Sequence, residues 1–391
     1  MRLRNFFKQG PALAYRYYFT PVLLIALIGF GDSIYLAVSH YRIYMDMGYQ
    51  SFCAISRTVN CDTVSQSAYS IFLNVPVPVW GIFGYGFVLC LLAFAGHPAA
   101  GKKRVWTLVF LISGAFSVYS VALALISSYL IGSYCIMCIL SYAVNLALLF
   151  YAWIIRKRFG CEPVWRAMKL DFGYLLRFGD AAFPVASIFG VTALFMVLAF
   201  PPYWRMEPPP LSNTTPTGVT EDGHPWIGAQ NPKLEIVEFS DYMCFQCKKM
   251  HFFLRRLVEA HPDAIRLVHR HFPMDNEFNP FVKEAFHVGS GKLALIALYA
   301  QTQGKFWQAS DFLFSMEKKD VKLKTILDTL GLDAEAMAMS LERDNLELTL
   351  KRDIYAGLKR GIIATPSYVI DEVVYTGAIP ADIMDKAMKQ P

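Results

Sequence analysis

The chain has 391 residues, of which 55% are hydrophobic, 15% aromatic and only 17% charged. This composition is too apolar for a wholly soluble protein, and the length allows a membrane part together with one globular domain. The formal net charge of +6 is explained below by membrane topology and therefore does not indicate a nucleic-acid partner.

Five apolar stretches are long enough to cross a lipid bilayer, whose hydrocarbon core of about 30 Å requires about 20 helical residues. They cover residues 21–41, 77–95, 105–130, 135–155 and 181–200. The first is longer than a signal-peptide apolar region and lacks a small-x-small cleavage site, so we predict a retained anchor. Asp32 within it should face the bundle interior, where it either relays protons or makes a structural hydrogen bond between helices.

Lys and Arg predict the orientation, because basic residues near span ends are retained in the cytoplasm. With the N-terminus inside, thirteen basic residues of the membrane half lie in the cytoplasm and three lie outside. We therefore predict a multi-pass protein of the inner (plasma) membrane with a cytoplasmic N-terminus. The loop after the first span and everything after residue 200 would be periplasmic.

Six of the eight cysteines then face an oxidising compartment, where disulfides form and exchange. Cys53 and Cys61 lie in the first outer loop, and their spacing allows a loop disulfide. It would be either a static staple or an electron shuttle, and its place beside another cysteine pair favours the shuttle. Cys90 and Cys161 are predicted to be packing residues.

The second pair, Cys135 and Cys138, opens the fourth apolar run. Residues three apart lie on one helix face, so their sulfurs can bridge or attack a third sulfur. The pattern predicts a redox dithiol at a membrane surface. The alternatives are two packed core cysteines or half of a zinc site.

This half of the chain resembles the vitamin K epoxide reductase family over about residues 19–158. The resemblance is carried by Ser33, Tyr35, His40, Cys53, Cys61, Ser67, Cys135, Cys138, Tyr142 and Asn145. It implies four helices around a quinone (menaquinone or ubiquinone), reduced by electrons that the loop cysteines pass to Cys135–Cys138. Ser67 would hold the loop, Tyr142 would contact the quinone, and Trp80 and Asn145 are further candidate contacts. In place of the Asn donor of the animal enzymes the chain has residues 77–80, so the resemblance implies quinone reduction and leaves epoxide chemistry open.

A Pro-rich segment at residues 201–223 predicts an extended linker. A β-rich run at residues 233–240 follows, then Cys244 and Cys247, then a helical pattern to residue 260. The helix N-terminus would lower the pKa of Cys244 and make it the attacking thiolate, and Cys247 would resolve the mixed disulfide. A zinc site with nearby histidines fits no standard spacing, so we predict no metal.

This second half resembles the DsbA-like branch of the thioredoxin superfamily, through the segment 239–247 and Thr365–Pro366. The resemblance implies that Glu238 is a buried acid able to accept the proton of Cys247; an exposed edge position is the alternative. It also implies that Pro366 belongs to a cis-proline loop beside the cysteines, and that residues 281–358 form a helical insertion. The dipeptide Phe245–Gln246 departs from the usual pattern, which leaves the oxidising strength open.

We therefore predict a multi-domain chain. An all-α polytopic bundle (residues 1–180) and a fifth connecting span (181–200) precede the linker and an α/β thioredoxin-like domain with a helical insertion (224–391). The predicted function is oxidation of dithiols in secreted or periplasmic proteins, with electrons delivered to the membrane quinone pool. The alternatives are the same parts used as a reductase or isomerase, and a membrane-tethered chaperone or peptide-binding module.

Overall fold

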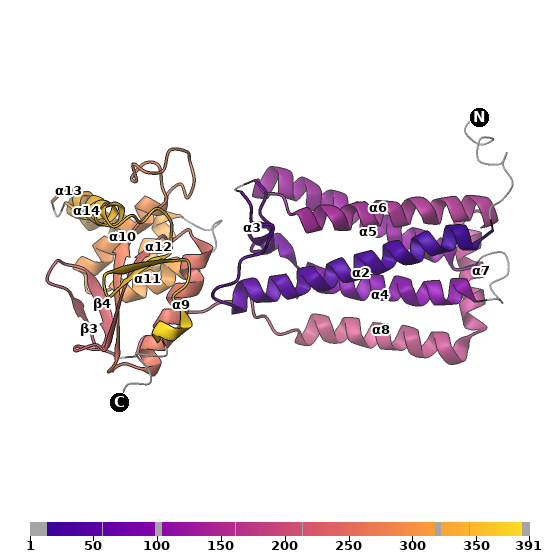
Figure 1. Cartoon of the computed structure of the whole chain (residues 1–391), viewed down its shortest axis with the longest axis horizontal. Coiled ribbons are helices and arrows are strands. Elements are labelled where there is room, and N and C mark those ends of the chain that lie inside the picture. The colour runs from indigo at the N-terminus through magenta and orange to yellow at the C-terminus, as the bar shows by residue number, and fades with distance from the viewer. Residues whose placement is uncertain are drawn as a thin grey trace. The chain divides into compact units, whose positions relative to one another are not determined.

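The structure, a computed structural model, describes residues 14–384 apart from residues 57, 98–103, 161, 213, 317–321 and 344. Cys161, predicted to be a packing residue, lies outside the described residues. Contacts divide the chain into two compact units, one ending at Trp204 and one beginning at Arg205 (Figure 1).

Five helices of the first unit are long and apolar enough to cross a membrane, which confirms the five predicted spans. They are α2 (Arg16–Met45), α4 (Val77–Gly96), α5 (Trp106–Ile126), α6 (Ile136–Ile155) and α8 (Gly179–Ala199). Single π-helical turns extend α5 (η2, Ser127–Ile131) and α6 (η3, Arg156–Gly160). A short helix that the sequence did not predict, α7 (Val164–Leu176), lies before α8.

The bundle core contains fully buried aliphatic side chains from α2, α4 and α6, among them Val22, Leu92 and Leu148. A glycine on α2 allows a close approach to α4, since a Cβ at Gly29 would lie 2.5 Å from the ring of Tyr85. Of the residues of α8, only Met196 is buried. This helix therefore lies at the edge of the bundle (Figure 1) with an apolar surface suited to lipid.

The loop between α2 and α4 is folded. It contains α3 (Cys61–Ser65), the 3₁₀ turn η1 (Ala68–Ser70) and a two-stranded hairpin of β1 (Ile71–Phe72) and β2 (Val75–Pro76). Asn60 begins α3 as a side-chain cap, because its Oδ1 accepts the Thr63 N–H at 3.1 Å.

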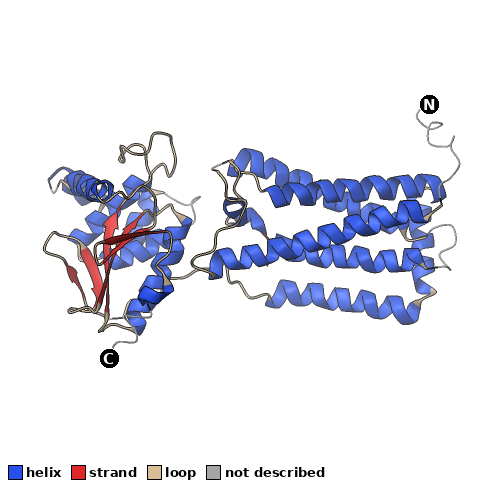
Figure 2. Ribbon diagram, in the orientation of Figure 1, coloured by secondary structure: helices blue, strands red, loops and turns tan. Residues whose placement is uncertain are grey.

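The second unit has a six-stranded mixed sheet in the order β3-β4-β6-β5-β7-β8, with helices around it (Figure 2). The strands are β3 (Thr217–Val219), β4 (Pro225–Gly228), β5 (Leu234–Ser240), β6 (Ile265–His271), β7 (Ser367–Ile370) and β8 (Val373–Thr376). Among the described strands of this sheet, β5 and β6 pair in parallel and the other neighbours pair antiparallel. Strand β3 falls within the segment predicted as linker, so the sheet begins before residue 224.

Helix α9 (Phe245–Ala260) connects β5 to β6. Five helices then lie between β6 and β7, as predicted for the insertion: α10 (Ser290–Thr302), α11 (Phe306–Ser315), α12 (Leu323–Leu330), α13 (Ala334–Arg343) and α14 (Leu346–Lys359). The predicted α/β domain with a helical insertion is confirmed.

Candidate active sites

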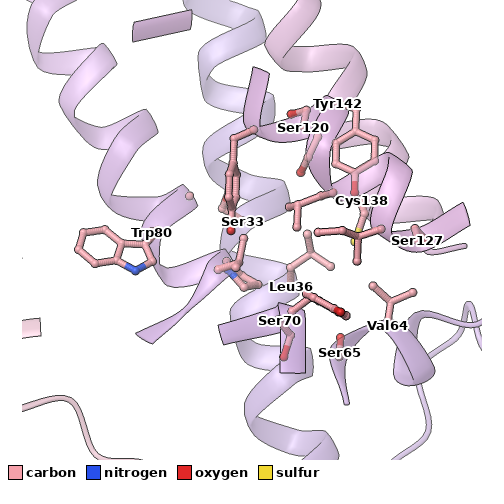
Figure 3. Close-up of a pocket in the computed structure, with 18 of the residues that line it drawn as sticks. Ser33, Leu36, Val64, Ser65, Ser70, Trp80, Ser120, Ser127, Cys138 and Tyr142 are labelled. Carbon is pink, nitrogen blue, oxygen red and sulfur yellow. The ribbon is translucent and has the colours of Figure 1, made fainter. Parts of the chain in front are cut away.

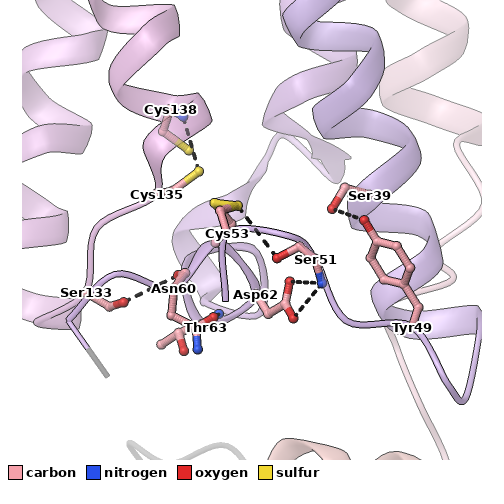
Figure 4. The surroundings of a disulfide bond; sticks show 11 residues. Ser39, Tyr49, Ser51, Cys53, Asn60, Asp62, Thr63, Ser133, Cys135 and Cys138 are labelled. Carbon is pink, nitrogen blue, oxygen red and sulfur yellow. Dashed lines mark hydrogen bonds between the residues drawn. A yellow bond between two sulfur atoms is a disulfide. The ribbon is translucent and has the colours of Figure 1, made fainter. Parts of the chain in front are cut away.

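The loop cysteines Cys53 and Cys61 form a disulfide in the first unit. A backbone pairing holds this disulfide beside the inner pair. The Asn60 N–H donates to the Tyr134 carbonyl at 2.9 Å, and the Tyr134 N–H donates to the Thr58 carbonyl at 2.8 Å. Cys61 follows Asn60 in the chain, and Cys135 follows Tyr134. Both cysteines pack with Cys53 in one buried cluster (Figure 4).

The two inner cysteines have different surroundings. Cys135 is the N-cap of α6, and its Sγ accepts the Cys138 N–H at 3.1 Å. It is 2% exposed and faces the loop disulfide. Cys138, one turn into the helix, packs against the same cluster and also lines a cavity, which Cys135 does not line. The pair therefore connects the loop disulfide to the cavity.

The cavity has a volume of about 190 Å³ and is lined by α2, α4, α5, α6 and the outer loop (Figure 3). Four predicted site residues line it: the candidate quinone contacts Trp80, Tyr142 and Asn145, and the loop residue Ser67. In Figure 3 the ring of Tyr142 ends next to Cys138. The structure thus brings the predicted contacts and one cysteine of the inner pair to one place.

Three of these four residues already use their polar groups within the protein. The Ser67 hydroxyl donates to the Val64 carbonyl at 2.7 Å, and the Trp80 indole N–H donates to the Phe72 carbonyl at 2.9 Å. Asn145 is held from both sides, accepting from Tyr85 Oη at 2.7 Å and donating to Ser120 Oγ at 2.9 Å. For the Tyr142 hydroxyl, the described part of the chain offers no such bond.

These features fit a quinone. A flat ring with two carbonyl oxygens needs apolar walls and a hydrogen-bond donor. The cavity supplies aromatic walls, including Trp80, Phe116 and Tyr119, and the unengaged hydroxyl of Tyr142 beside Cys138. Ser67 fits the predicted loop-holding role, since its bond closes the end of α3.

The third pair lies at the start of α9 in the second unit. Cys244 is the N-cap, and its Sγ accepts the Cys247 N–H at 3.3 Å. The Cys244 thiol also lies 3.5 Å from the carbonyl oxygen of Thr365, whose peptide bond to Pro366 is cis. The predicted proline loop is therefore next to the cysteines.

The two thiols of this pair differ in acidity. A hydrogen bond from the Cys247 side chain, helped by the charge of His287 against the effect of burial, lowers the pKa of Cys244 to about 7. Burial, followed by the neighbouring Cys244, raises the pKa of Cys247 well above its usual value. Cys244 is thus the better nucleophile at neutral pH, and Cys247, 1% exposed, is the resolving thiol.

Glu238 on β5 is 1% exposed, so it does not occupy an exposed edge position. Its Oε1 pairs with His269 Nδ1 at 2.7 Å and with His251 Nδ1 at 3.4 Å, and His251 Nε2 pairs with Asp311 at 2.7 Å. Burial opposes ionisation of Glu238, but the two histidines outweigh it and lower its pKa to about 2. Glu238, His251 and His269 thus form a buried hydrogen-bonded network, and their ligand atoms lie within 4.8 Å of one another, close enough to hold a metal ion.

Sequence reasoning missed several polar partners. Ser141 and Tyr85 line the cavity, and His287 acts on Cys244. No sequence motif relates these residues to their partners, because the partners are far apart in the chain. Tyr85 is 60 residues from its partner Asn145, and Ser141 is 109 residues from its partner Asp32. Among these partners, only Asp32 could be singled out from the sequence, because it is a carboxyl group within a predicted membrane span.

Known protein families match part of each half of the chain. Residues 20–153 match the vitamin K epoxide reductase family, and residues 235–389 match the DSBA-like thioredoxin domain. Over 147 residues the chain is 26% identical to a Na(+)/H(+) antiporter NhaA of Herminiimonas arsenicoxydans; this match covers 37% of the chain and only 22% of that protein.

Three solved structures are similar to part of the chain. A thioredoxin-like oxidoreductase from Silicibacter pomeroyi DSS-3 is 25% identical, with 43% of this chain and 91% of that chain covered and a TM-score of 0.36. BdbD from Bacillus subtilis is 18% identical, with 45% and 98% covered and a TM-score of 0.35. Proteus mirabilis ScsC is 22% identical, with 57% and 96% covered and a TM-score of 0.33.

Proposed function

We propose that this thiol-disulfide oxidoreductase, whose chain joins a vitamin K epoxide reductase family domain to a DSBA-like thioredoxin domain, drives disulfide formation in secreted proteins and delivers the electrons to a membrane quinone. Substrate dithiols reduce the Cys244–Cys247 disulfide. The electrons then pass to Cys53–Cys61, to Cys135–Cys138 and to ubiquinone or menaquinone in the cavity. The acceptor, when bound, supplies the oxidising power for the whole sequence.

One observation carries this proposal: Cys135 packs against the loop disulfide while Cys138 lines the cavity. Thiol-disulfide exchange requires a thiolate to reach a disulfide sulfur, and reduction of a quinone requires a thiol beside its ring. A pair of structural staples would need neither arrangement. A reactive outer nucleophile, Cys244, supports the same reading against a chaperone or peptide-binding module.

The remaining residues take roles that follow from their contacts. Tyr142 donates a hydrogen bond to a ring oxygen and stabilises the negative charge that develops there. With a pKa of about 2, Glu238 is a poor proton acceptor, so we assign its network with the histidines a structural role in place of the predicted proton transfer from Cys247. Pro366 and Thr365 present the backbone against which the substrate dithiol lies. The excess of basic residues at one end of the spans supports a periplasmic location for the second unit.

The test uses the purified full chain in detergent with a reduced dithiol protein as donor. Cys135→Ala and Cys138→Ala should each abolish quinone reduction and leave Cys244 and Cys247 reduced. Cys90→Ala, at a half-buried cysteine of α4 outside both sites, is the matched control and should be unaffected. Continued quinone turnover in either inner variant would exclude this pair as the terminal site.

The direction of transfer is tested in intact cells by thiol trapping. An oxidase keeps Cys244–Cys247 largely oxidised, and the Cys138→Ala variant should convert it to the dithiol form. If the wild-type pair is instead reduced in cells, the same route serves a reductase or isomerase.

A further inference from the structure

Asp32 is a buried carboxyl group in the middle of a membrane-length helix. It is 5% exposed, and its Oδ2 accepts a hydrogen bond from Ser141 Oγ of α6. Its other oxygen, Oδ1, is buried and has no hydrogen-bonding partner among the residues that the structure describes. Ionisable groups are costly at this depth, and those that occur there usually have a function.

Ser141 places this carboxyl group next to the candidate quinone cavity. Ser141 lines the cavity, as does Cys138, and the two residues lie three positions apart on the same face of α6. Asp32 is within Coulombic range of the sulfurs of Cys135 and Cys138. The Ser141 hydroxyl therefore lies between the buried carboxyl group of Asp32 and the cavity that Cys138 lines.

The protonation state of Asp32 follows from its surroundings. An ionised carboxylate would leave Oδ1 charged and without a donor in an apolar bundle, which is strongly unfavourable. A neutral acid can instead donate its O–H to Ser141, which leaves the serine O–H free to point into the cavity. A proton is then available at the cavity wall.

We propose that Asp32 and Ser141 form the proton-transfer site of the cavity, an inference that rests on the proposed function. Oxidation of the Cys135–Cys138 dithiol breaks two S–H bonds, forms one S–S bond and releases two electrons and two protons, which a quinone acceptor takes up as two O–H groups. Asp32 gives one proton through Ser141 to the nearer ring oxygen and regains a proton from the Cys138 thiol. The second ring oxygen takes its proton from water at the outer end of the cavity, and the Cys135 proton returns to that water.

The first test does not need a quinone. Infrared difference spectra between the oxidised and reduced full chain should contain a band from a protonated carboxyl group. We expect Asp32→Asn to remove this band and Ser141→Ala, which deletes its hydrogen-bonding partner, to shift it. Asp171→Asn is the matched control, because Asp171 is another buried carboxyl group of the first unit, paired with the Thr107 N–H at 2.9 Å and distant in sequence from the cysteines. A carboxyl band that is unchanged in Asp32→Asn would overturn the proposal.

The second test measures turnover. Asp32→Asn should slow quinone reduction by about a hundredfold, in the range for loss of a general acid, and Asp32→Glu should recover most of the rate. Exchange between the outer domain and the loop disulfide should remain normal in all variants, which also reports that they are folded. Normal turnover in both Asp32→Asn and Ser141→Ala would refute the proton-transfer role. If the wild type reduces no quinone at all, the proposed function fails, whereas loss of the infrared band in Asp32→Asn would still support a proton site coupled to the inner pair.

Discussion

The acidity of Cys244 depends most on the side chain of Cys247, and removing that side chain gives a quantitative prediction. With a pKa of about 7 instead of the usual 9.0, Cys244 is about half thiolate at pH 7 rather than about 1%, a difference of about fiftyfold. A less basic thiolate is also a weaker nucleophile, and a Brønsted slope of about 0.45 over this range lowers its reactivity by about eightfold. The net advantage of the native site at pH 7 is therefore about sixfold.

The variant Cys247→Ala should consequently react more slowly than the wild type at pH 7, by up to about sixfold, and faster than the wild type near pH 10, by up to about eightfold. The reversal occurs because both proteins are then fully ionised and the variant thiolate is more basic. The assay is the rate of alkylation of Cys244 in the reduced full chain, read by mass spectrometry of its peptide. Cys247→Ser, which keeps a hydroxyl donor, should retain most of the lowered pKa. A midpoint still near pH 7 in Cys247→Ala would show that the thiol of Cys247 is not the main cause.

Three further predictions concern the other groups. Tyr142→Phe should lower the rate of quinone reduction by roughly ten- to a thousandfold while the protein still inserts in membranes, and an unchanged rate and apparent affinity would place the ring elsewhere. Cys247→Ser should trap Cys244 in mixed disulfides that include the loop pair, detectable by non-reducing electrophoresis after proteolysis; adducts with secreted proteins alone would contradict the internal route. Glu238→Gln should destabilise the second unit by about 3 kcal/mol, because His251 loses one of its carboxylate partners, and thermal unfolding measures this. Since the pKa of Glu238 is lowered to about 2, the stabilisation should be present above about pH 4.5 and be lost as the pH falls toward 2.

The sequence predicted the features that depend on neighbouring residues. Apolar runs predicted all five membrane-length helices, and two Cys-x-x-Cys motifs predicted pairs at helix starts, because both signals are local in the chain. The error at β3 has a physical cause, since a short edge strand and a Pro-rich linker are both extended and differ only in their hydrogen bonds.

The polar partners could not be predicted because they are created by tertiary packing. Tyr85 and Asn145 meet only when α4 and α6 pack, and a glycine at position 29 leaves the space that the Tyr85 ring fills. Glu238 was expected to be buried, but its hydrogen bonds to histidines depend on the register of β5 with β6 and on the position of α9. A single sequence contains no signal for such pairs.

The two Cys-x-x-Cys motifs share one local geometry and differ in the surroundings of their second cysteine. In both, the first cysteine is the helix N-cap and accepts the N–H of the second, at 3.1 Å for Cys135 and 3.3 Å for Cys244. The second cysteine of the outer motif, Cys247, is closed in the core, so its sulfur can attack only the bond that Cys244 makes. Cys138 instead faces a cavity, so the same motif can pass electrons onward to a non-sulfur acceptor. In the proposed function, the packing around the second cysteine therefore distinguishes an exchange site from a terminal oxidation site. Filling the cavity beside Cys138 should then leave the inner pair capable only of thiol-disulfide exchange.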